Sequence, residues 1–368
     1  MKKRVLIVAS TMEHIENFHM PYIEGLKSAG ADVFIMAKGV ARSGAKPDFQ
    51  VPFEKKFFST KNLKIIEIIK QILQKNHFDV IILNTTLAAF LVRAAVKKLK
   101  TKPRVINIVH GYLFGKSTSK LKNFVMLKAE RYVRKVTDDI LVMNNEDYEI
   151  ATKYKLAKSN IIKINGMGFN KDNRITESGV KYEKKSRYAI TFVGELSKRK
   201  NQKLLLNLVK ELENKGVEVK LNLIGTGAME SELKLLSEEL GISSKVNFAG
   251  YDKNIQKYFD KTDFYISPSQ IEGLPFNILE AMRAGSIVLS ADVKGCNDII
   301  EDNVNGFLYP FDDIEFLTNK ILEIKDDEKL LNKIKINAVE SVKKYEFDDV
   351  YKKNLKILTK LMMESRWK

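Results

Sequence analysis

Short apolar runs alternate with longer amphipathic stretches along almost the whole chain of 368 residues. Runs rich in Val and Ile that are bounded by polar or glycine-containing turns are typical of buried strands. Apolar residues that recur every three or four positions are typical of helices. Strands that alternate with helices form right-handed βαβ units and a parallel sheet covered on both faces. The pattern therefore predicts an α/β protein built from doubly wound parallel sheets.

The alternation occurs in two series. Strands of the first series are predicted at Val5–Ala9, Val33–Ala37, Val80–Leu83, Val105–Val109, Ile140–Met143 and Ile161–Ile164, with helices at Met20–Ala29, Lys61–Lys75, Leu87–Lys100 and Leu121–Lys135. Strands of the second series are predicted at Tyr188–Val193, Val219–Ile224, Val246–Phe248, Phe264–Ser267 and Ile287–Ser290. Its helices are predicted at Gln202–Glu213, Met229–Leu240, Asn254–Phe259 and Pro275–Ala284, followed by Ile314–Ile324, Glu328–Lys344 and Asp348–Met363. Residues 170–187 lack apolar periodicity and predict a linker between two domains.

Composition excludes several classes of protein. Hydrophobic residues make up 44% and charged residues 30% of the chain, which excludes the disordered and fibrous classes. No apolar run approaches the roughly 18 residues of a membrane helix, and the longest candidate, Leu87–Val96, contains Arg93. The run Val5–Ala9 is too short for a signal peptide. The single cysteine, Cys296, excludes an internal disulfide and is expected to be an unreactive small residue, which fits a reducing cytoplasm.

The net charge of +17 is unevenly distributed. Residues 1–180 contain 32 Lys and Arg against 16 Asp and Glu, and residues 351–368 contain 6 against 1. Residues 181–350 contain 25 basic and 29 acidic residues, so they are slightly acidic. Such asymmetry is typical of a lobe that faces a polyanion, such as nucleic acid, an anionic bilayer or an acidic soluble substrate. Lysine-rich helices that are merely solvated are the alternative explanation for any one cluster.

The most informative segment covers residues 267–285, Ser-Pro-Ser-Gln-Ile-Glu-Gly-Leu-Pro-Phe-Asn-Ile-Leu-Glu-Ala-Met-Arg-Ala-Gly. A buried strand is expected to end at Ser267, and Pro275 suits the first position of a helix. The backbone amides from Gly273 to Asn277, apart from that of Pro275, would then lie at a helix N-terminus, where phosphate binds favourably. Gly273 would let the backbone approach such a ligand closely. The segment therefore predicts an anion-binding loop.

Two carboxylates accompany this loop. Glu272 precedes the expected helix and Glu280 lies in its second turn, so both could flank one molecule and take different hydroxyls. Set in Glu-Gly-Leu-Pro and Leu-Glu-Ala-Met, the pair resembles the signature of glycosyltransferase family 4, the retaining GT-B enzymes. Further similar segments are 192–201, 224–227, 248–251 and 303–307, and in the first half 17–23, 109–112 and 144–148. The segments of the first half resemble the subgroup that builds capsular polysaccharide and exopolysaccharide.

The resemblance implies a fold. It implies two Rossmann-like domains that face a central cleft, in the arrangement called GT-B. Residues 1–172 would form an N-terminal acceptor-binding domain, and residues 186–345 a C-terminal domain that binds the nucleotide-sugar donor. The helix of residues 346–368 would pack back onto the first domain and add its positive charge there.

The resemblance also implies roles for particular residues. Glu272 would contact hydroxyls of the donor sugar, and Glu280 the ribose of the nucleotide. Lys200 and Arg199 would neutralise the charge that develops on the leaving diphosphate, and Lys200 is ranked first within a run of three basic residues. His110 would contact the donor sugar or the reaction centre from the first domain. Further donor contacts are expected from Gly194, Gly225, Gly227, Tyr251, Gly273, Leu274, Phe276 and Asn277.

Structural alternatives and departures from the family accompany these roles. His110 could be a structural histidine and Tyr251 a core aromatic residue, and no role is assigned to His14 or His19. The family often has arginine where this chain has Glu195, so Arg199 and Lys200 would have to hold the diphosphate alone. The loop after the first strand, residues 10–14, lacks the glycine pair that is common in the family.

The resemblance implies a retaining transfer of a hexosyl or N-acetylhexosaminyl group from a nucleotide-diphosphate sugar, and a UDP-sugar is expected as the donor. No Asp-x-Asp triplet is present, so neither a metal nor another cofactor is expected. The expected acceptor is a polyprenyl-diphosphate-linked or other anionic glycan at an anionic membrane surface, on the cytoplasmic face of the plasma membrane. A sugar-nucleotide epimerase with the same scaffold is the alternative. A nucleic-acid-binding protein is a remoter one, because no recognisable module accompanies the basic charge, and no nucleic-acid partner is expected.

Overall fold

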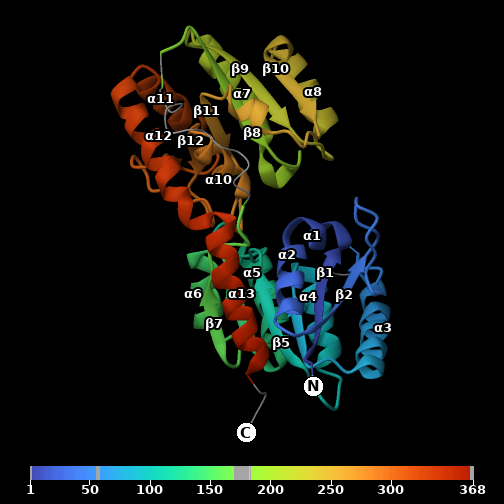
Figure 1. The fold of residues 1–368 in the computed structure, drawn as a ribbon. Coiled ribbons are helices and arrows are strands. Elements are labelled where there is room, and N and C mark those ends of the chain that lie inside the picture. The colour runs from blue at the N-terminus through green and yellow to red at the C-terminus, as the bar shows by residue number, and fades with distance from the viewer. Residues whose placement is uncertain (1, 55–58, 170–181, 183, 365–368) are drawn as a thin grey trace. The chain divides into compact units, whose positions relative to one another are not determined.

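The computed structural model describes residues 2–54, 59–169, 182 and 184–364. It forms two compact units, coloured from blue to red along the chain in Figure 1. Unit 1 comprises Met1–Gly168 and Phe347–Lys368, and unit 2 comprises Phe169–Glu346. Most of the linker predicted over residues 170–187 lies outside the described residues.

Unit 1 is built on a seven-stranded parallel sheet with the strand order β3-β2-β1-β4-β5-β6-β7. Its strands are β1 (Arg4–Thr11), β2 (Asp32–Lys38), β3 (Phe49–Gln50), β4 (Val80–Leu83), β5 (Arg104–Val109), β6 (Asp139–Val142) and β7 (Asn160–Lys163). Its helices are α1 (Met12–Phe18), α2 (Met20–Ser28), α3 (Lys61–Asn76), α4 (Thr86–Val96), α5 (Lys120–Val133), α6 (Asn145–Lys153) and α13 (Phe347–Met363). The order of strands reverses between β1 and β4, which makes this the topological switch point of unit 1.

Strand β1 is buried on both faces, as a central strand of a parallel sheet should be. Leu6 and Val8 belong to a core formed with α3 and α4, and both side chains are completely buried. The alternating residues Val5 and Ile7 are also buried and point to the opposite face of the sheet. The continuous apolar run in the sequence is therefore explained by burial on two sides.

The C-terminal helix α13 packs against α2 within unit 1, and it is the red helix in Figure 1. Gly25 allows the close approach, because a Cβ atom there would lie 2.6 Å from the hydroxyl oxygen of Tyr351. Asn354 of α13 donates hydrogen bonds to the hydroxyl of Tyr22 (3.2 Å) and to the carbonyl of Gly166 (2.8 Å). The helix is thus fixed to unit 1 by packing and by buried polar contacts.

A buried ion pair explains the arginine within the apolar run 87–96. Arg93 of α4 donates two hydrogen bonds of 2.8 Å to Glu130 of α5, and both side chains are almost completely buried. The bidentate geometry compensates much of the cost of removing both charges from water. Arg93 therefore joins two helices of unit 1.

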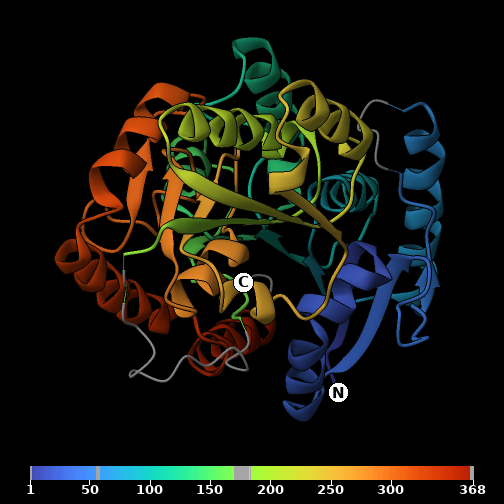
Figure 2. The same ribbon diagram turned by 90° about the horizontal axis from the view of Figure 1, so that it is seen from above.

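Unit 2 is built on a six-stranded parallel sheet with the order β10-β9-β8-β11-β12-β13. Its strands are β8 (Arg187–Val193), β9 (Glu218–Ile224), β10 (Val246–Gly250), β11 (Phe264–Ser267), β12 (Ile287–Ala291) and β13 (Phe307–Tyr309). Its helices are α7 (Gln202–Asn214), α8 (Glu230–Glu239), α9 (Gln256–Phe259), α10 (Phe276–Arg283), α11 (Ile314–Ile324) and α12 (Glu328–Val342). Figure 2 shows the sheet between α7 and α8 on one side and α10 and α12 on the other. The switch point of this unit lies between β8 and β11.

The predicted α/β architecture of two parallel sheets is confirmed, but four elements were not predicted. Helix α1 lies where a polar loop was expected, and it is capped by Thr11, whose side chain accepts from the amide of His14. Helix α6 and the short edge strands β3 and β13 were also missed. Strands of two or three residues give little periodicity. Helix α10 begins at Phe276, with Pro275 as its N-cap rather than its first residue.

Among the described residues, no helix is both long and apolar enough to cross a membrane. Cys296 is completely buried, and this burial raises the pKa of its thiol to about 12. A thiol of this kind is mostly protonated at neutral pH and therefore a poor nucleophile.

Candidate active site

The loops that follow β8 and β11 lie side by side at the switch point of unit 2. The loop after β8 runs through Gly194 into a short 3-10 helix, Lys198–Lys200, and the loop after β11 carries Glu272 and leads into α10. The amide of Gln270 donates to the carbonyl of Arg199 at 2.9 Å, which joins the two loops directly. Ligands of open α/β sheets bind at this position, outside the carboxyl ends of the strands.

Two of the residues singled out in the sequence converge on the carboxylate of a third. The ammonium of Lys200 donates to Oε1 of Glu272 at 2.5 Å, and Nη1 of Arg199 lies 3.4 Å from Oε2 of the same side chain. Arg199 also donates to the carbonyl of Ile271 at 2.9 Å. The side chains of Lys200 and Glu272 are each only 9% exposed, whereas that of Arg199 is 40% exposed. The site therefore holds two cations against one buried anion.

Glu280 lies close by, on α10. Burial raises the pKa of its carboxyl group from 4.5 to about 7, so the group titrates near neutral pH. Both Glu280 and Glu272 act electrostatically on the buried hydroxyl of Tyr265, whose pKa is raised well above its ordinary value chiefly by burial. That hydroxyl donates to the carbonyl of Val193 at 3.4 Å. The two carboxylates thus lie near the same buried hydroxyl, and Glu272 is ion-paired whereas burial dominates the environment of Glu280.

Gly225 and Gly227 allow the loops after β8 and β9 to lie in contact. A Cβ atom on Gly225 would lie 2.0 Å from the carbonyl oxygen of Gly194, and one on Gly227 would lie 2.1 Å from that of Leu196. Gly225 also has a φ of +135°, which side chains with a Cβ rarely adopt. Both glycines are therefore required by backbone packing, whether or not a ligand is bound.

The first turn of α10 is tied to the central strand of the sheet. Its N-cap, Pro275, supplies no side-chain hydrogen bond to the helix. The side-chain amide of Asn277 donates to the carbonyl of Val193 at 2.7 Å, so this side chain fixes the turn to the end of β8. Leu274 is buried, whereas Phe276 is half-buried at the start of the helix.

Two of the predicted positions are exposed to solvent. Tyr251 is among the exposed large hydrophobic residues, so the alternative that it is a core aromatic residue is wrong. Glu195, the residue that replaces the family's usual arginine, is also exposed. Its backbone carbonyl accepts a hydrogen bond of 2.7 Å from the side chain of Gln202.

Two residues that were not singled out in the sequence support these loops. The buried side chain of Gln202 spans the turn after β8, because it donates to the carbonyl of Glu195 and accepts from the amide of Ser197 at 3.3 Å. Gly295 has a φ of +82°, and a Cβ there would lie 2.6 Å from the carbonyl oxygen of Gly273. Neither residue has a sequence signal of its own, since glutamine and glycine are common in loops.

His110, the one predicted site residue of unit 1, directly follows β5. It lies in a cluster with His14 and His19, whose ring centroids are 4.9 and 5.5 Å from its own. Burial lowers the pKa of His14 to about 4 and that of His110 to about 3, and it lowers the pKa of His19 well below 6.5. The structure thus brings together three neutral imidazoles, two of which had been assigned no role.

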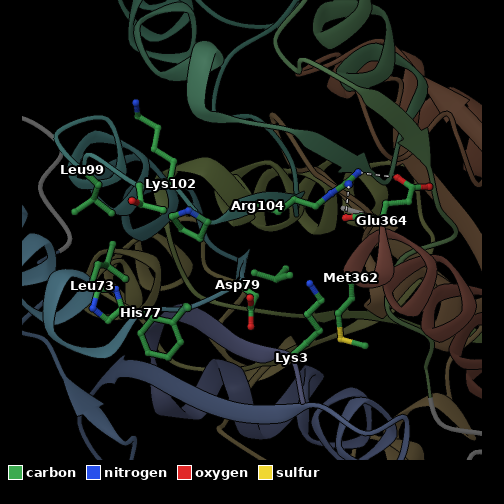
Figure 3. A pocket seen from close by; sticks show the side chains of 13 residues that line it. Lys3, Leu73, His77, Asp79, Leu99, Lys102, Arg104, Met362 and Glu364 are labelled. Carbon is green, nitrogen blue, oxygen red and sulfur yellow. Dashed lines mark hydrogen bonds and ion pairs between the residues drawn. The ribbon is translucent and has the colours of Figure 1, made fainter. Parts of the chain in front are cut away.

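A cavity of about 380 Å³ lies at the other end of the unit 1 sheet (Figure 3). It is lined by Lys3, Asp79 and Arg104, which lie at the amino ends of β1, β4 and β5. Arg104 is neutralised there by Asp139 and by Glu364, each at 2.8 Å. Ligands of open α/β sheets bind outside the carboxyl ends of the strands, and this cavity lies at the amino ends. We therefore interpret it as a packing gap between the sheet and the segment that carries Glu364.

Comparison with known proteins identifies the family. Residues 4–145 match the family described as "Glycosyl transferase 4-like", and residues 173–341 match "Glycosyl transferases group 1". The chain is 27% identical over 345 residues to EpsD of Bacillus subtilis, which is named as a glycosyltransferase, and the match covers 91% of this chain and 90% of EpsD.

A second relative agrees with this assignment, and a solved structure shows the same fold. The chain is 26% identical over 282 residues to the UDP-Gal:alpha-D-GlcNAc-diphosphoundecaprenol alpha-1,3-galactosyltransferase of Escherichia coli, over 74% of this chain and 72% of that enzyme. The fold of the present chain is similar to that of Anabaena HepE in complex with UDP and glucose, with a TM-score of 0.75 at 17% identity. That similarity covers 97% of this chain and all of the HepE chain. The resemblance seen in the sequence is thereby confirmed, and the chain belongs to the group 1 glycosyltransferases, with the two parallel-sheet units of the GT-B fold.

Proposed function

We propose that this glycosyltransferase moves a sugar from a UDP-sugar to a lipid-linked glycan, with retention of anomeric configuration, in the synthesis of a cell-surface polysaccharide. The observation that carries the proposal is the convergence of Lys200 and Arg199 on Glu272 at the switch point of unit 2. The proposal is supported by the UDP and glucose in the HepE complex and by the diphosphoundecaprenol-linked acceptor in the name of the galactosyltransferase relative.

The ion pairs suggest how the donor enters the site. Without a donor, Glu272 neutralises Lys200, which is buried and needs a counter-charge. When the donor binds, its diphosphate takes over both cations, and Glu272 is released to accept hydrogen bonds from hydroxyls of the sugar. Arg199 presents a planar fork and Lys200 a point charge, so together they match a diphosphate that becomes more negative in the transition state.

The nucleotide is held by the second carboxylate and by α10. Glu280 accepts hydrogen bonds from the ribose hydroxyls, and the N-terminal end of α10 favours the negative diphosphate through its dipole. Asn277 keeps this turn against β8 through its 2.7 Å bond to Val193. Gly194, Gly225 and Gly227 keep the neighbouring loops compact enough for the ligand to approach the backbone.

The chemical step needs no nucleophile from the protein. The bond between the anomeric carbon and the diphosphate oxygen breaks, and the acceptor oxygen forms the new bond on the same face of the sugar. The proton of the acceptor hydroxyl passes to the departing phosphate oxygen. The charge on the diphosphate is carried by Lys200 and Arg199, and no metal ion takes part in this proposal. His110 contributes a contact to the donor sugar, a role that rests on the family resemblance.

A thermal-shift panel followed by product analysis tests the function. UDP-sugars should raise the melting temperature more than GDP- or ADP-sugars, and a lipid-linked acceptor should receive the labelled sugar. Incubation with the UDP-sugar alone separates transfer from epimerisation, because an epimerase would convert the sugar without any acceptor. Stabilisation by GDP-sugars alone, or conversion without an acceptor, would contradict the proposal.

The proposal places the acceptor at an anionic membrane surface. Helix α5 exposes Leu121 (75%) and Phe124 (57%) among the exposed lysines Lys120, Lys122 and Lys128. Apolar side chains beside basic ones suit the interface of an anionic bilayer, where each Lys or Arg contributes about 1 kcal/mol. The net charge of residues 1–180, +16 from 32 basic and 16 acidic residues, supports the same surface.

Flotation with anionic liposomes tests this contact. We expect binding at low salt that weakens at high salt, because the Debye length shortens. Replacing Leu121 and Phe124 by serine should release the protein. The same change at Leu63, which is 70% exposed on α3, should have little effect. The absence of binding at low salt would refute membrane association, while leaving the transfer reaction open to the assay above.

A further inference from the structure

Three of the four histidines of the chain meet at the switch point of unit 1. His14 lies on α1 after β1, His19 lies between α1 and α2, and His110 follows β5. One ring nitrogen of each lies within 4.8 Å of the ring nitrogens of the other two. No other such cluster of potential metal ligands occurs in the described part of the chain.

The cluster contains nitrogen atoms without hydrogen-bond partners among the described residues. Nε2 of His14 and Nε2 of His19 are both buried and unpartnered, and the His19 side chain is only 2% exposed. Leaving a buried polar atom without a partner costs about 1–3 kcal/mol. Two such atoms on neighbouring rings are therefore available to a metal ion.

The third imidazole is oriented by a buried amide. The side-chain nitrogen of Asn84 donates to the carbonyl of Val8, which turns its oxygen towards Nε2 of His110 at 3.2 Å. An amide oxygen can only accept, so Nε2 of His110 carries the proton and Nδ1 carries the lone pair. Imidazoles that bind metals have this arrangement, in which one ring nitrogen donates to a carbonyl and the other is the ligand.

We propose that His14, His19 and His110 bind one divalent transition-metal ion of the zinc class, with a fourth position open to water or to an oxygen of a ligand. Three neutral imidazoles form a ligand set for zinc, copper, nickel or cobalt. Magnesium and calcium prefer oxygen ligands and do not suit this set.

The geometry needs only small adjustments to hold such an ion. Zinc–nitrogen bonds of about 2.0–2.1 Å place tetrahedral ligands roughly 3.4 Å apart, so the rings must move by on the order of 1 Å. His14 is only partly buried, so its side chain can move most easily. All three ligands belong to unit 1. Of the proposed donor contacts only His110 is shared with this site, so the residues of unit 2 that are proposed to hold the donor are not needed for metal binding.

Zinc binding to the full-length protein, measured by calorimetry after treatment with chelator, tests the proposal without a donor or an acceptor. We expect one ion per chain, with an affinity that falls at least about 100-fold in the double variant His14→Ala/His110→Ala. Replacing the residue that orients the His110 ring, Asn84→Ala, should lower the affinity for zinc about 10–100-fold. The matched control is His77→Ala, which removes the remaining, exposed histidine and should bind zinc as the wild type does.

Cobalt substitution keeps the proposal testable even if the variants fold poorly. Cobalt bound to the wild-type protein should give the intense ligand-field absorption of a four- or five-coordinate ion, and zinc should displace it. An absence of zinc binding to the wild type would overturn the site. So would zinc binding that is lost in His77→Ala, or a cobalt spectrum that matches the hydrated ion.

Discussion

The two switch points of this glycosyltransferase occupy the same place in two sheets of similar order, yet they have opposite chemistry. In unit 2, two cations converge on the carboxylate of Glu272, and a second carboxylate lies nearby. In unit 1, the corresponding place holds three neutral imidazoles. In each sheet the topology places the carboxyl ends of several strands together, and the side chains that follow those ends decide what can bind there.

The two sites also differ in how they compensate the free-energy cost of burying polar side chains. The unit 2 site neutralises Lys200 internally through Glu272, so it is stable when empty and can exchange one anion for another. The unit 1 cluster avoids charge, because burial lowers the pKa of each histidine, but Nε2 of His14 and Nε2 of His19 have no hydrogen-bond partner in the part of the chain that the structure describes. The first arrangement suits an anionic ligand and the second suits a metal ion.

The change that should break the charged site most severely is Lys200→Ala. It removes the buried cation that is proposed to face the diphosphate, so kcat should fall by about 10²–10³-fold or more. A transfer assay with a UDP-sugar measures this, and the melting temperature reports whether the protein is folded. Lys198→Ala, on the same turn but exposed, should change kcat little. A Lys200→Ala enzyme with nearly wild-type turnover would show that the ion pair is only structural.

A glycine substitution tests the packing under the same site. In Gly225→Ala the new methyl group would lie 2.0 Å from the carbonyl oxygen of Gly194, in a backbone conformation with φ of +135°. We expect a loss of about 3 kcal/mol in the free energy of unfolding, measured with urea, and weaker stabilisation by UDP.

The matched control for this packing test is Gly216→Ala. Gly216 also has a positive φ, +74°, but a Cβ atom there would meet nothing within 4 Å. Gly216→Ala should therefore lower the free energy of unfolding by only about 1 kcal/mol. Equal losses in the two variants would mean that the contact between the loops is not tight.

Glu280→Gln should have two distinct effects, one on the affinity for UDP and one on how the stability of the protein depends on pH. The loss of a charged acceptor for two ribose hydroxyls should weaken UDP binding about 10–100-fold. The folded pKa of about 7 exceeds the ordinary 4.5, so the folded wild type binds this proton more tightly than the unfolded chain does. The resulting stability is complete below pH 4.5 and is lost as the pH rises to about 7.

A glutamine side chain does not titrate in this range. The melting temperature of Glu280→Gln should therefore rise relative to that of the wild type as the pH rises from 5 to 8. Melting curves across this range, with and without UDP, measure both effects. A constant difference in melting temperature would contradict the raised pKa of Glu280. Unchanged UDP affinity would contradict its role at the ribose.

The smallest expected effect is that of metal removal on transfer. Since the diphosphate charge is assigned to Lys200 and Arg199, EDTA should leave turnover nearly unchanged even if it strips an ion from the histidine cluster. Initial rates before and after dialysis against EDTA measure this. An enzyme that EDTA inactivates and that magnesium or manganese restores would refute metal-independent transfer at the donor site.

Much of the fold follows from local pattern. The predicted strands at β4, β5 and β11 agree with the structure to within one residue, because runs such as Val80–Leu83 are apolar throughout and end in clear turns. Helix α1 was missed because its buried side consists only of Met12 and Ile15, with polar residues between them. The periodicity of a seven-residue helix is too short to stand out beside a strand.

The grouping of side chains at the candidate active site could be predicted only in part. Glu272 and Lys200 are 72 positions apart, and their ion pair depends on the β8–β11 neighbourhood, which the strand order decides. Gln202 and Gly295 have no sequence signal, although both hold the loops of the site. His14 and His19 had the weakest signal of all, because an isolated histidine carries no pattern.

The sequence by itself determined the class of fold, the two series of strands and the family, because these depend on local periodicity and on short motifs. Tertiary structure alone decided which side chains share a volume and therefore which are neutral and which are ion-paired. Charge state and contact are properties of an environment assembled from distant strand ends. For that reason Glu272 could be named from its motif, whereas its partners and the three-histidine cluster became visible only when the sheets were formed.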